Sequence, residues 1–151
     1  MRQAMFDLTS LSTPESAHDP ADAVPSRVDL RSNTCIYVVD DEPAVAELVA
    51  ALLEIEGLGS TVFQSPVQAL HAFRAANPRP KLLITDYRMN VLNGMELIEQ
   101  CKLLEPELHT MLISGHASDD NVAAFAVRPE AFIRKPFRSI VLIAAVRSLL
   151  T

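Results

Sequence analysis

Three consecutive carboxylates directly follow a run of β-branched and aromatic residues. Asp40, Asp41 and Glu42 come immediately after the stretch CIYVV at 35–39. Carboxylates this close repel one another, and taking them out of water costs free energy unless a positive charge lies nearby. Their type and spacing therefore indicate a site that holds a positively charged group.

Other polar residues stand at the ends of apolar runs farther along the chain. Asp86 follows KLLIT at 81–85, Ser114 ends TMLIS at 110–114, and Lys135 comes shortly after AFI at 131–133. If the apolar runs are parallel strands, these residues all lie at the carboxyl ends. That edge of an open α/β sheet is where ligands bind, at the point where the strand order reverses.

The elements that must position these residues alternate between strand and helix. This alternation predicts an α/β fold, a five-stranded parallel doubly wound sheet with five helices covering both faces. The flavodoxin-like order 2-1-3-4-5 places the reversal between the first and third strands. The expected strands are 35–39, 60–63, 81–85, 110–114 and 131–133, and the expected helices are 43–56, 66–76, 94–104, 118–127 and 138–150.

Local signals support the helices. Pro43 suits a first helical turn, Gly57 a helix end, and Ser65 an N-cap. In the first helix, apolar residues at helical spacing predict one buried face, made of Val45, Leu48, Val49, Leu52 and Leu53.

Composition restricts the class of protein. The longest apolar runs are too short for a transmembrane helix, and no signal peptide begins the chain. A net charge of −6 argues against a nucleic-acid partner. Cys35 and Cys101 are interpreted as buried free thiols of a cytoplasmic protein. Residues 1–33, with several prolines and few large apolar residues, are expected to form a disordered or loosely ordered tail before a domain at 34–151.

The chain resembles the receiver domain of two-component response regulators, in the manner of single-domain chemotaxis regulators. The resemblance covers Thr34 to Leu150. It rests on features in matching order: the Asp40-Asp41 pair, Asp86 in LLITDYRM with Gly94 downstream, Ser114 in LISGHA, and Lys135-Pro136-Phe137.

The resemblance implies the chemistry. Asp86 is the expected phosphoacceptor, and Mg²⁺ (or Mn²⁺) is the expected cofactor, bound directly by Asp41, Asp86 and the backbone carbonyl of Arg88, and through water by Asp40. Glu42 is expected to be less central, at a helix start where its charge suits the helix dipole. Lys135 and Ser114 are expected to bind phosphoryl oxygens.

The resemblance also implies a signalling role without a separate catalytic domain. A sensor histidine kinase or histidine phosphotransfer protein is the expected donor. Phe132 is the expected switch aromatic, responding to movement of Ser114. The chain departs from the family pattern at Asn90, Asn93 and the segment FAVRPEAF at 125–132, which affects the loops near the site.

Other classes fit less well. A haloacid-dehalogenase-like phosphatase needs Asp-x-Asp after the first strand, and a flavodoxin-like cofactor binder needs a Ser/Thr/Gly-rich loop there. A receiver-like binding scaffold with vestigial phosphorylation remains as the alternative. The four histidines lack metal-ligand spacing, and His116 is interpreted as a solvated loop residue.

The final helix is apolar on nearly all sides. Leu142, Val146 and Leu149, with Ile143 and Leu150, are expected to pack on the sheet. Ile140 and Val141 would then form an exposed apolar patch that docks a downstream target protein or a second copy, unless the N-terminal tail covers it. Because no output domain follows this helix, we expect the signal to leave through protein contacts.

Overall fold

Five short strands form one parallel sheet in the order β2-β1-β3-β4-β5. The structure is a computed structural model that describes residues 35–115 and 119–151. The predicted fold class and strand order are confirmed. The strands are β1 (Cys35–Val39), β2 (Gly59–Phe63), β3 (Leu82–Asp86), β4 (His109–Ser114) and β5 (Ala131–Arg134).

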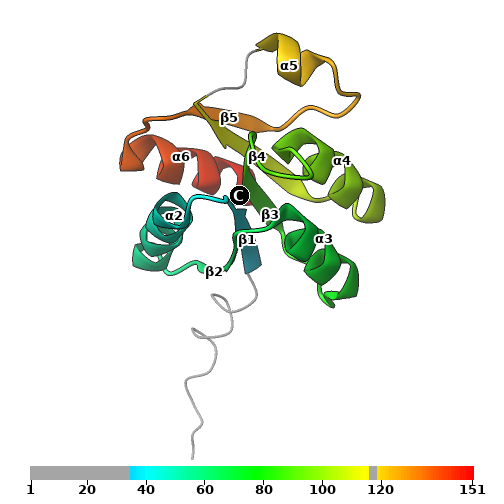
Figure 1. The fold of residues 1–151 in the computed structure, drawn as a ribbon. Helices are drawn as coiled ribbons and strands as arrows, with labels where there is room; N and C mark the ends of the chain where they lie inside the picture. Colours follow the sequence, from blue (N-terminus) through cyan, green and yellow to red (C-terminus); the bar gives the residue numbers. More distant parts are fainter. Residues whose placement is uncertain (1–34, 116–118) are drawn as a thin grey trace, which may run out of the picture. The chain divides into compact units, whose positions relative to one another are not determined.

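Helices cover both faces of the sheet (Figure 1). Buried residues of α2 and α6 pack on one face, and those of α3, α4 and α5 pack on the other. The helices are α2 (Pro43–Ile55), α3 (Pro66–Ala75), α4 (Gly94–Leu104), α5 (Asp119–Ala123) and α6 (Ser139–Leu150).

The apolar strand residues divide between these two layers by simple alternation. In β1, Ile36 and Val38 belong to the α2–α6 side, whereas Tyr37 and Val39 belong to the α3–α4 side. This follows from the two-residue period of a strand, whose successive side chains point to opposite faces. A sheet buried on both faces explains why β1 is apolar throughout and why β3 is apolar until Thr85 and Asp86 at its end.

Local signals set the helix ends. The Ser65 hydroxyl accepts the backbone N–H of Gln68 at 3.2 Å, which confirms the predicted cap of α3. Gly57 follows α2 with φ of 78°, a conformation that glycine adopts without strain. Asn93 and Glu96 form a reciprocal capping box at the start of α4, each side chain bonded at 2.8 Å to the other's backbone N–H.

The structure corrects two details of the sequence prediction. The weakest helix, expected at 118–127, ends early, because its described part, Asp119–Ala123, stops four residues before the predicted end. The expected buried face of α2 is also partly wrong, because Leu48 is 52% exposed and the buried residues are Ala46, Val49 and Leu53. The helix is apolar nearly all round, so periodicity alone did not decide its orientation. The small side chain of Ala46 lets this face approach the sheet.

Some expectations fall on other parts of the chain. The predicted N-terminal tail at 1–33 and His116 lie outside the described residues. Within the described ranges, no helix combines the length and apolar character needed to span a membrane. Both cysteines are free, and burial raises the pKa of the Cys101 thiol to about 12.

Candidate functional site

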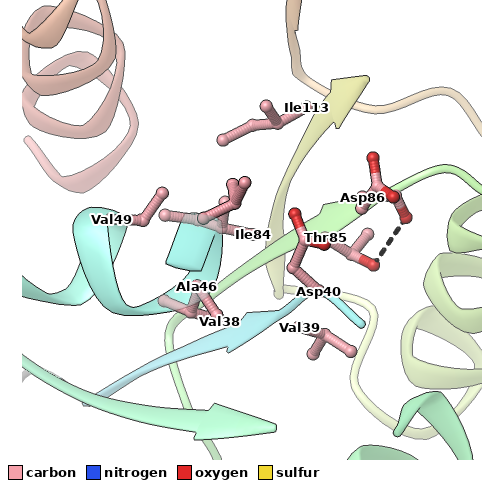
Figure 2. Close-up of a pocket in the computed structure, with 10 residues that line it drawn as sticks. Val38, Val39, Asp40, Ala46, Val49, Ile84, Thr85, Asp86 and Ile113 are labelled. Carbon is pink, nitrogen blue, oxygen red and sulfur yellow. Dashed lines mark hydrogen bonds between the residues drawn. The ribbon is translucent and has the colours of Figure 1, made fainter. Parts of the chain in front are cut away.

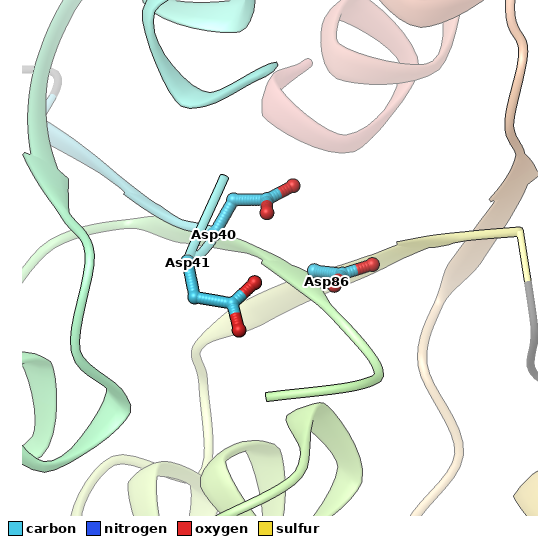
Figure 3. Close-up of side chains that lie close together, drawn as sticks. All are labelled: Asp40, Asp41 and Asp86. Carbon is cyan, nitrogen blue, oxygen red and sulfur yellow. The ribbon is translucent and has the colours of Figure 1, made fainter. Parts of the chain in front are cut away.

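Three carboxylates meet at the carboxyl edge of the sheet, two directly after β1 and one at the end of β3 (Figure 3). Asp40, Asp41 and Asp86 each offer an oxygen within 4.8 Å of the others. Asp40 and Asp86 are 3% and 7% exposed, whereas Asp41 is open to solvent. The sequence prediction that these acids converge is therefore correct in geometry, and β3 includes Asp86 as its last residue.

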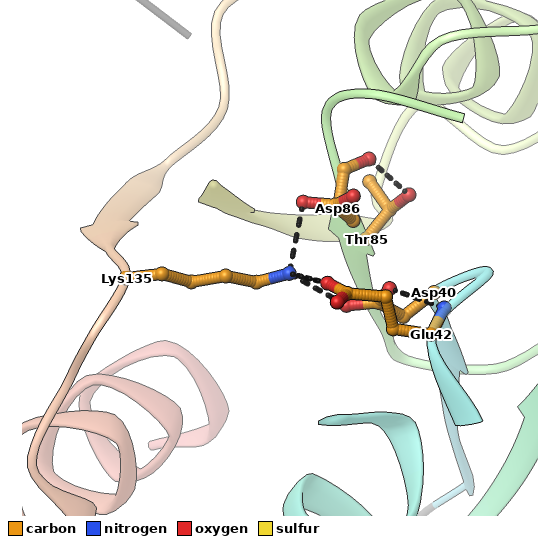
Figure 4. Close-up of polar contacts among 5 residues, drawn as sticks. All are labelled: Asp40, Glu42, Thr85, Asp86 and Lys135. Atoms are coloured by element: carbon orange, nitrogen blue, oxygen red, sulfur yellow. Dashed lines mark hydrogen bonds and ion pairs between the residues drawn. The ribbon is translucent and has the colours of Figure 1, made fainter. Parts of the chain in front are cut away.

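The positive group within this acidic cluster is the side chain of Lys135, which follows β5. Its Nζ lies 3.0 Å from Oδ2 of Asp40, 3.2 Å from Oδ1 of Asp86 and 3.3 Å from Oε1 of Glu42 (Figure 4). The lysine thus spans the sheet edge from β5 to the acids after β1 and β3. Its ammonium partly neutralises the block of negative charge that the sequence presents after β1.

Backbone and hydroxyl groups hold the two buried aspartates. The backbone N–H of Glu42 donates to Oδ1 of Asp40 at 2.9 Å. The Thr85 hydroxyl donates to the backbone carbonyl of Asp86 at 2.9 Å. Asp40, Thr85 and Asp86 also border a small cavity of about 10 Å³ between the sheet and α2, lined otherwise by apolar side chains (Figure 2). The carboxylates therefore lie between an apolar base and solvent.

Burial dominates the electrostatics of the two aspartates. It raises the pKa of Asp40 and Asp86 above the ordinary value for aspartate. For Asp86, the charge of Asp40 raises the pKa further, and Lys135 offsets only part of the rise. Burial alone lowers the pKa of Lys135, but its aspartate partners outweigh this effect and the pKa is raised. The cluster thus carries more negative charge than Lys135 alone can compensate.

Gly94 brings the start of α4 against the end of β3. A Cβ atom at this position would lie 2.1 Å from the carbonyl oxygen of Asp86 and 2.9 Å from Cδ1 of Leu112. The Gly94 N–H also donates to the carbonyl of Tyr87 at 2.8 Å. Only glycine fits so close to another backbone, which explains physically why a glycine stands downstream of Asp86.

The remaining predicted site residues lie around this cluster. Ser114 is fully buried at the end of β4, and its carbonyl accepts the Lys135 N–H at 3.1 Å. Arg88 lies on the exposed loop after Asp86. Phe132 is half-buried against the α3–α4 side of the core, and the Arg134 guanidinium lies 5.3 Å from its ring centre. Their functional roles stay predictions.

The three aspartates fit a magnesium ion in type and in spacing. Mg²⁺ prefers oxygen ligands at about 2.0–2.1 Å, so two oxygens on one ion lie at most about 4.2 Å apart. The observed oxygens, within 4.8 Å of one another, reach this range after small side-chain movements. Burial raises the pKa of Asp40 and Asp86, and a divalent cation would stabilise their ionised forms.

Sequence reasoning missed the contact between Glu42 and Lys135. The sequence relates the charge of Glu42 only to the dipole of the following helix, yet its carboxylate lies 3.3 Å from Nζ of Lys135. The available signal was its position: it directly follows the acidic pair, at the same sheet edge as Lys135. The Asn93–Glu96 capping box was also missed, although Asn followed three residues later by Glu is its sequence signature.

A parallel five-stranded sheet of this order, with clustered aspartates and a lysine at its carboxyl edge, defines a receiver-type signalling fold. The response regulator receiver domain family matches residues 36–147. The chain belongs to this family, and the resemblance inferred from its motifs is confirmed. It is therefore a receiver domain of the two-component response regulator class.

Relatives and solved structures agree with this assignment. The chain is 36% identical over 107 residues to the nitrogen assimilation regulatory protein NtrX of Azorhizobium caulinodans, covering 69% of this chain and 23% of that protein. It is 34% identical over 113 residues to the transcriptional regulatory protein FixJ of Rhizobium meliloti, covering 74% and 54%. The chain thus spans between about a quarter and about half the length of these relatives. A receiver domain protein from Clostridium thermocellum superposes with a TM-score of 0.71 at 27% identity, covering 78% of this chain and 94% of that one.

Proposed function

We propose that this receiver domain accepts a phosphoryl group on Asp86. The observation that carries the proposal is the gathering of Asp40, Asp41 and Asp86 around one point, with the Lys135 ammonium 3.2 Å from Asp86. A buried acid used only to end a strand needs neither two further carboxylates nor a lysine reaching across from β5. Family membership supports the same role, because aspartate phosphorylation is typical of receivers.

The transfer itself forms one bond and breaks another. An oxygen of the Asp86 carboxylate attacks phosphorus, and the bond from phosphorus to the donor's histidine nitrogen breaks. The imidazole leaves with the electron pair, and Asp86 becomes an acyl phosphate. Such a transition state is loose, so the protein contributes mainly positioning and charge stabilisation. Lys135, already beside Asp86, donates to a phosphoryl oxygen, and the Ser114 hydroxyl donates to another.

Magnesium completes the charge balance. Asp41, Asp86 and the backbone carbonyl of Arg88 are the proposed direct ligands, and Asp40 acts through water. Both oxygens of Asp40 already accept hydrogen bonds, from the Glu42 N–H and from Lys135, which supports this indirect role. When bound, Mg²⁺ (or Mn²⁺) neutralises the carboxylates and one phosphoryl oxygen.

The response to phosphorylation passes from Ser114 to Phe132. Movement of Ser114 toward the phosphoryl group changes the space beside β5, where Phe132 is half-buried and packs against the α3–α4 side of the core. This is a two-state element that one charged group biases. The proposed domain at 34–151 contains all of these parts.

Protein contacts deliver and transmit the signal. The proposed donor is a sensor histidine kinase or a histidine phosphotransfer protein in the cytoplasm. The proposed output surface includes Ile140 and Val141 of α6, which are 69% and 45% exposed. Neither side chain packs in the hydrophobic core. A downstream target or a second copy is therefore the expected partner of this surface. The domain itself acts as the phosphoacceptor.

Incubation with acetyl phosphate and Mg²⁺, followed by intact-mass measurement, tests the proposal. The wild-type protein is expected to gain the mass of one phosphoryl group, and EDTA is expected to prevent the gain. Asp86→Asn keeps the shape of the side chain and removes the nucleophile, so it should gain nothing. A folded wild-type protein that accepts no phosphoryl group would instead favour a binding scaffold with vestigial phosphorylation.

A further inference from the structure

The ammonium group of Lys135 already has a full set of partners. A lysine ammonium has three N–H donors. Three carboxylates surround it, those of Asp40 at 3.0 Å, Asp86 at 3.2 Å and Glu42 at 3.3 Å. Lys135 therefore gains a phosphoryl oxygen as a partner only by giving up one of these carboxylates.

The three carboxylates differ in how firmly they are held. The Asp40 side chain is 5% exposed and accepts a backbone N–H at 2.9 Å, and the Asp86 side chain is 8% exposed at the end of a central strand. The Glu42 side chain is 66% exposed. It occupies the N-cap position of α2 but makes no cap hydrogen bond there. Of the three carboxylates, that of Glu42 therefore rotates away from Lys135 into solvent at the lowest cost in free energy.

We propose that Glu42 is a positioning residue whose carboxylate competes with the incoming phosphoryl group for Lys135, and so restrains phosphorylation of Asp86. This inference rests on the proposed function. Carboxylate and phosphoryl oxygens are both anionic acceptors that pair with an ammonium in the same way. Glu42 must leave before Lys135 can stabilise the transferring group, and its charge at the mouth of the site also repels an anionic donor. The residue then sets how readily the domain is phosphorylated, while Asp86 remains the acceptor.

Two substitutions with the same change of charge separate an effect of Glu42 at the site from an effect of net charge alone. Glu42→Gln removes the anionic competitor, and Glu47→Gln removes a charge from an exposed position farther along the same helix. The rate of phosphorylation by acetyl phosphate with Mg²⁺ is measured by intact mass. Because exposed ion pairs contribute about 0.2–1 kcal/mol, Glu42→Gln is expected to react roughly 1.4- to fivefold faster than Glu47→Gln. Equal rates in the two variants, or a slower Glu42→Gln, would overturn the inference.

A second measurement follows the contact itself. The NMR signal of the Lys135 Cε–Hε group is expected to shift in Glu42→Gln and to stay in place in Glu47→Gln. An unmoved signal in Glu42→Gln would show that the two side chains do not interact and would also overturn the inference. A wild-type protein that accepts no phosphoryl group defeats the proposed function and this inference together. A wild-type protein that accepts it, without acceleration in Glu42→Gln, defeats the inference alone.

Discussion

Replacing Gly94 by alanine pushes a methyl group against the backbone of Asp86. The new Cβ would lie 2.1 Å from the Asp86 carbonyl oxygen, whereas real Cβ atoms essentially never approach closer than 3.0 Å. Neither side can rotate away, because one is the last residue of β3 and the other is the first residue of α4. The helix start must therefore move by about 1 Å, which strains the Gly94–Tyr87 hydrogen bond and the packing of α4.

The cost of this movement follows from overpacking. Forcing extra atoms into a packed site costs about 1–3 kcal/mol, more than the roughly 0.4–1 kcal/mol that a glycine-to-alanine change gains through the unfolded chain. For a domain of this size, we expect Gly94→Ala to lower the melting temperature by roughly 4–10 °C. Because the displaced carbonyl belongs to Asp86, the proposed phosphoacceptor, phosphorylation should slow by roughly 10- to 100-fold.

Gly115 offers a matched control on the same edge of the sheet. A Cβ there would meet the Lys135 Cβ at 3.6 Å, an ordinary van der Waals contact. Gly115→Ala should therefore unfold within roughly 0.5 kcal/mol of the wild type. Thermal unfolding and acetyl phosphate kinetics on both variants decide the matter. If Gly94→Ala proved as stable and as reactive as Gly115→Ala, the close approach of α4 to Asp86 would be refuted.

Three further predictions concern the cap, the charge cluster and the output surface. Asn93→Ala removes the capping box of α4 and should lower the free energy of unfolding by about 1 kcal/mol in urea; no change would mean that the cap is not formed. Since burial raises the pKa of Asp40, its contribution to stability is present at low pH and is lost as the pH rises through the folded-state pKa. In EDTA, thermal unfolding of the wild type should therefore show a loss of stability above about pH 4 that is smaller in Asp40→Asn, and an identical loss in both would contradict the charge balance. A variant with Ile140→Glu and Val141→Glu should stay folded and phosphorylatable, since both residues are exposed. It should lose self-association in light scattering or target binding in pull-down. Unchanged association would rule out the patch.

The positions of the aspartates and Lys135 could be predicted because they depend only on strand order. Parallel strands bring their carboxyl ends to one edge, so any polar residue that ends an apolar run is placed there. Asp40, Asp86 and Lys135 follow this rule, and the structure brings them within hydrogen-bonding distance. The presence of these helices was equally predictable, since Pro43 suits a first helical turn through its fixed backbone angle and the Ser65 side chain caps the start of α3.

Side-chain direction within an apolar helix could not be predicted in the same way. In α2, apolar residues occupy several faces, and packing against the sheet selects Ala46 over Leu48. The contact between Glu42 and Lys135 could not be predicted for a related reason. Whether Lys135 reaches Glu42 across the carboxyl edge of the sheet depends on how β5 and α2 are arranged in space. These features are set by tertiary packing, which local spacing does not encode.

Chemical mapping of the phosphoryl group on the wild-type protein tests directly whether Asp86 is the phosphoacceptor. After incubation with acetyl phosphate and Mg²⁺, borohydride reduces an acyl phosphate to an alcohol and leaves free carboxylates intact. Peptide mass spectrometry then locates the reduced residue. We expect reduction at Asp86 alone, and only when Mg²⁺ was present. Reduction at Asp40 or Asp41, or none at Asp86 in a protein that had gained a phosphoryl mass, would contradict it.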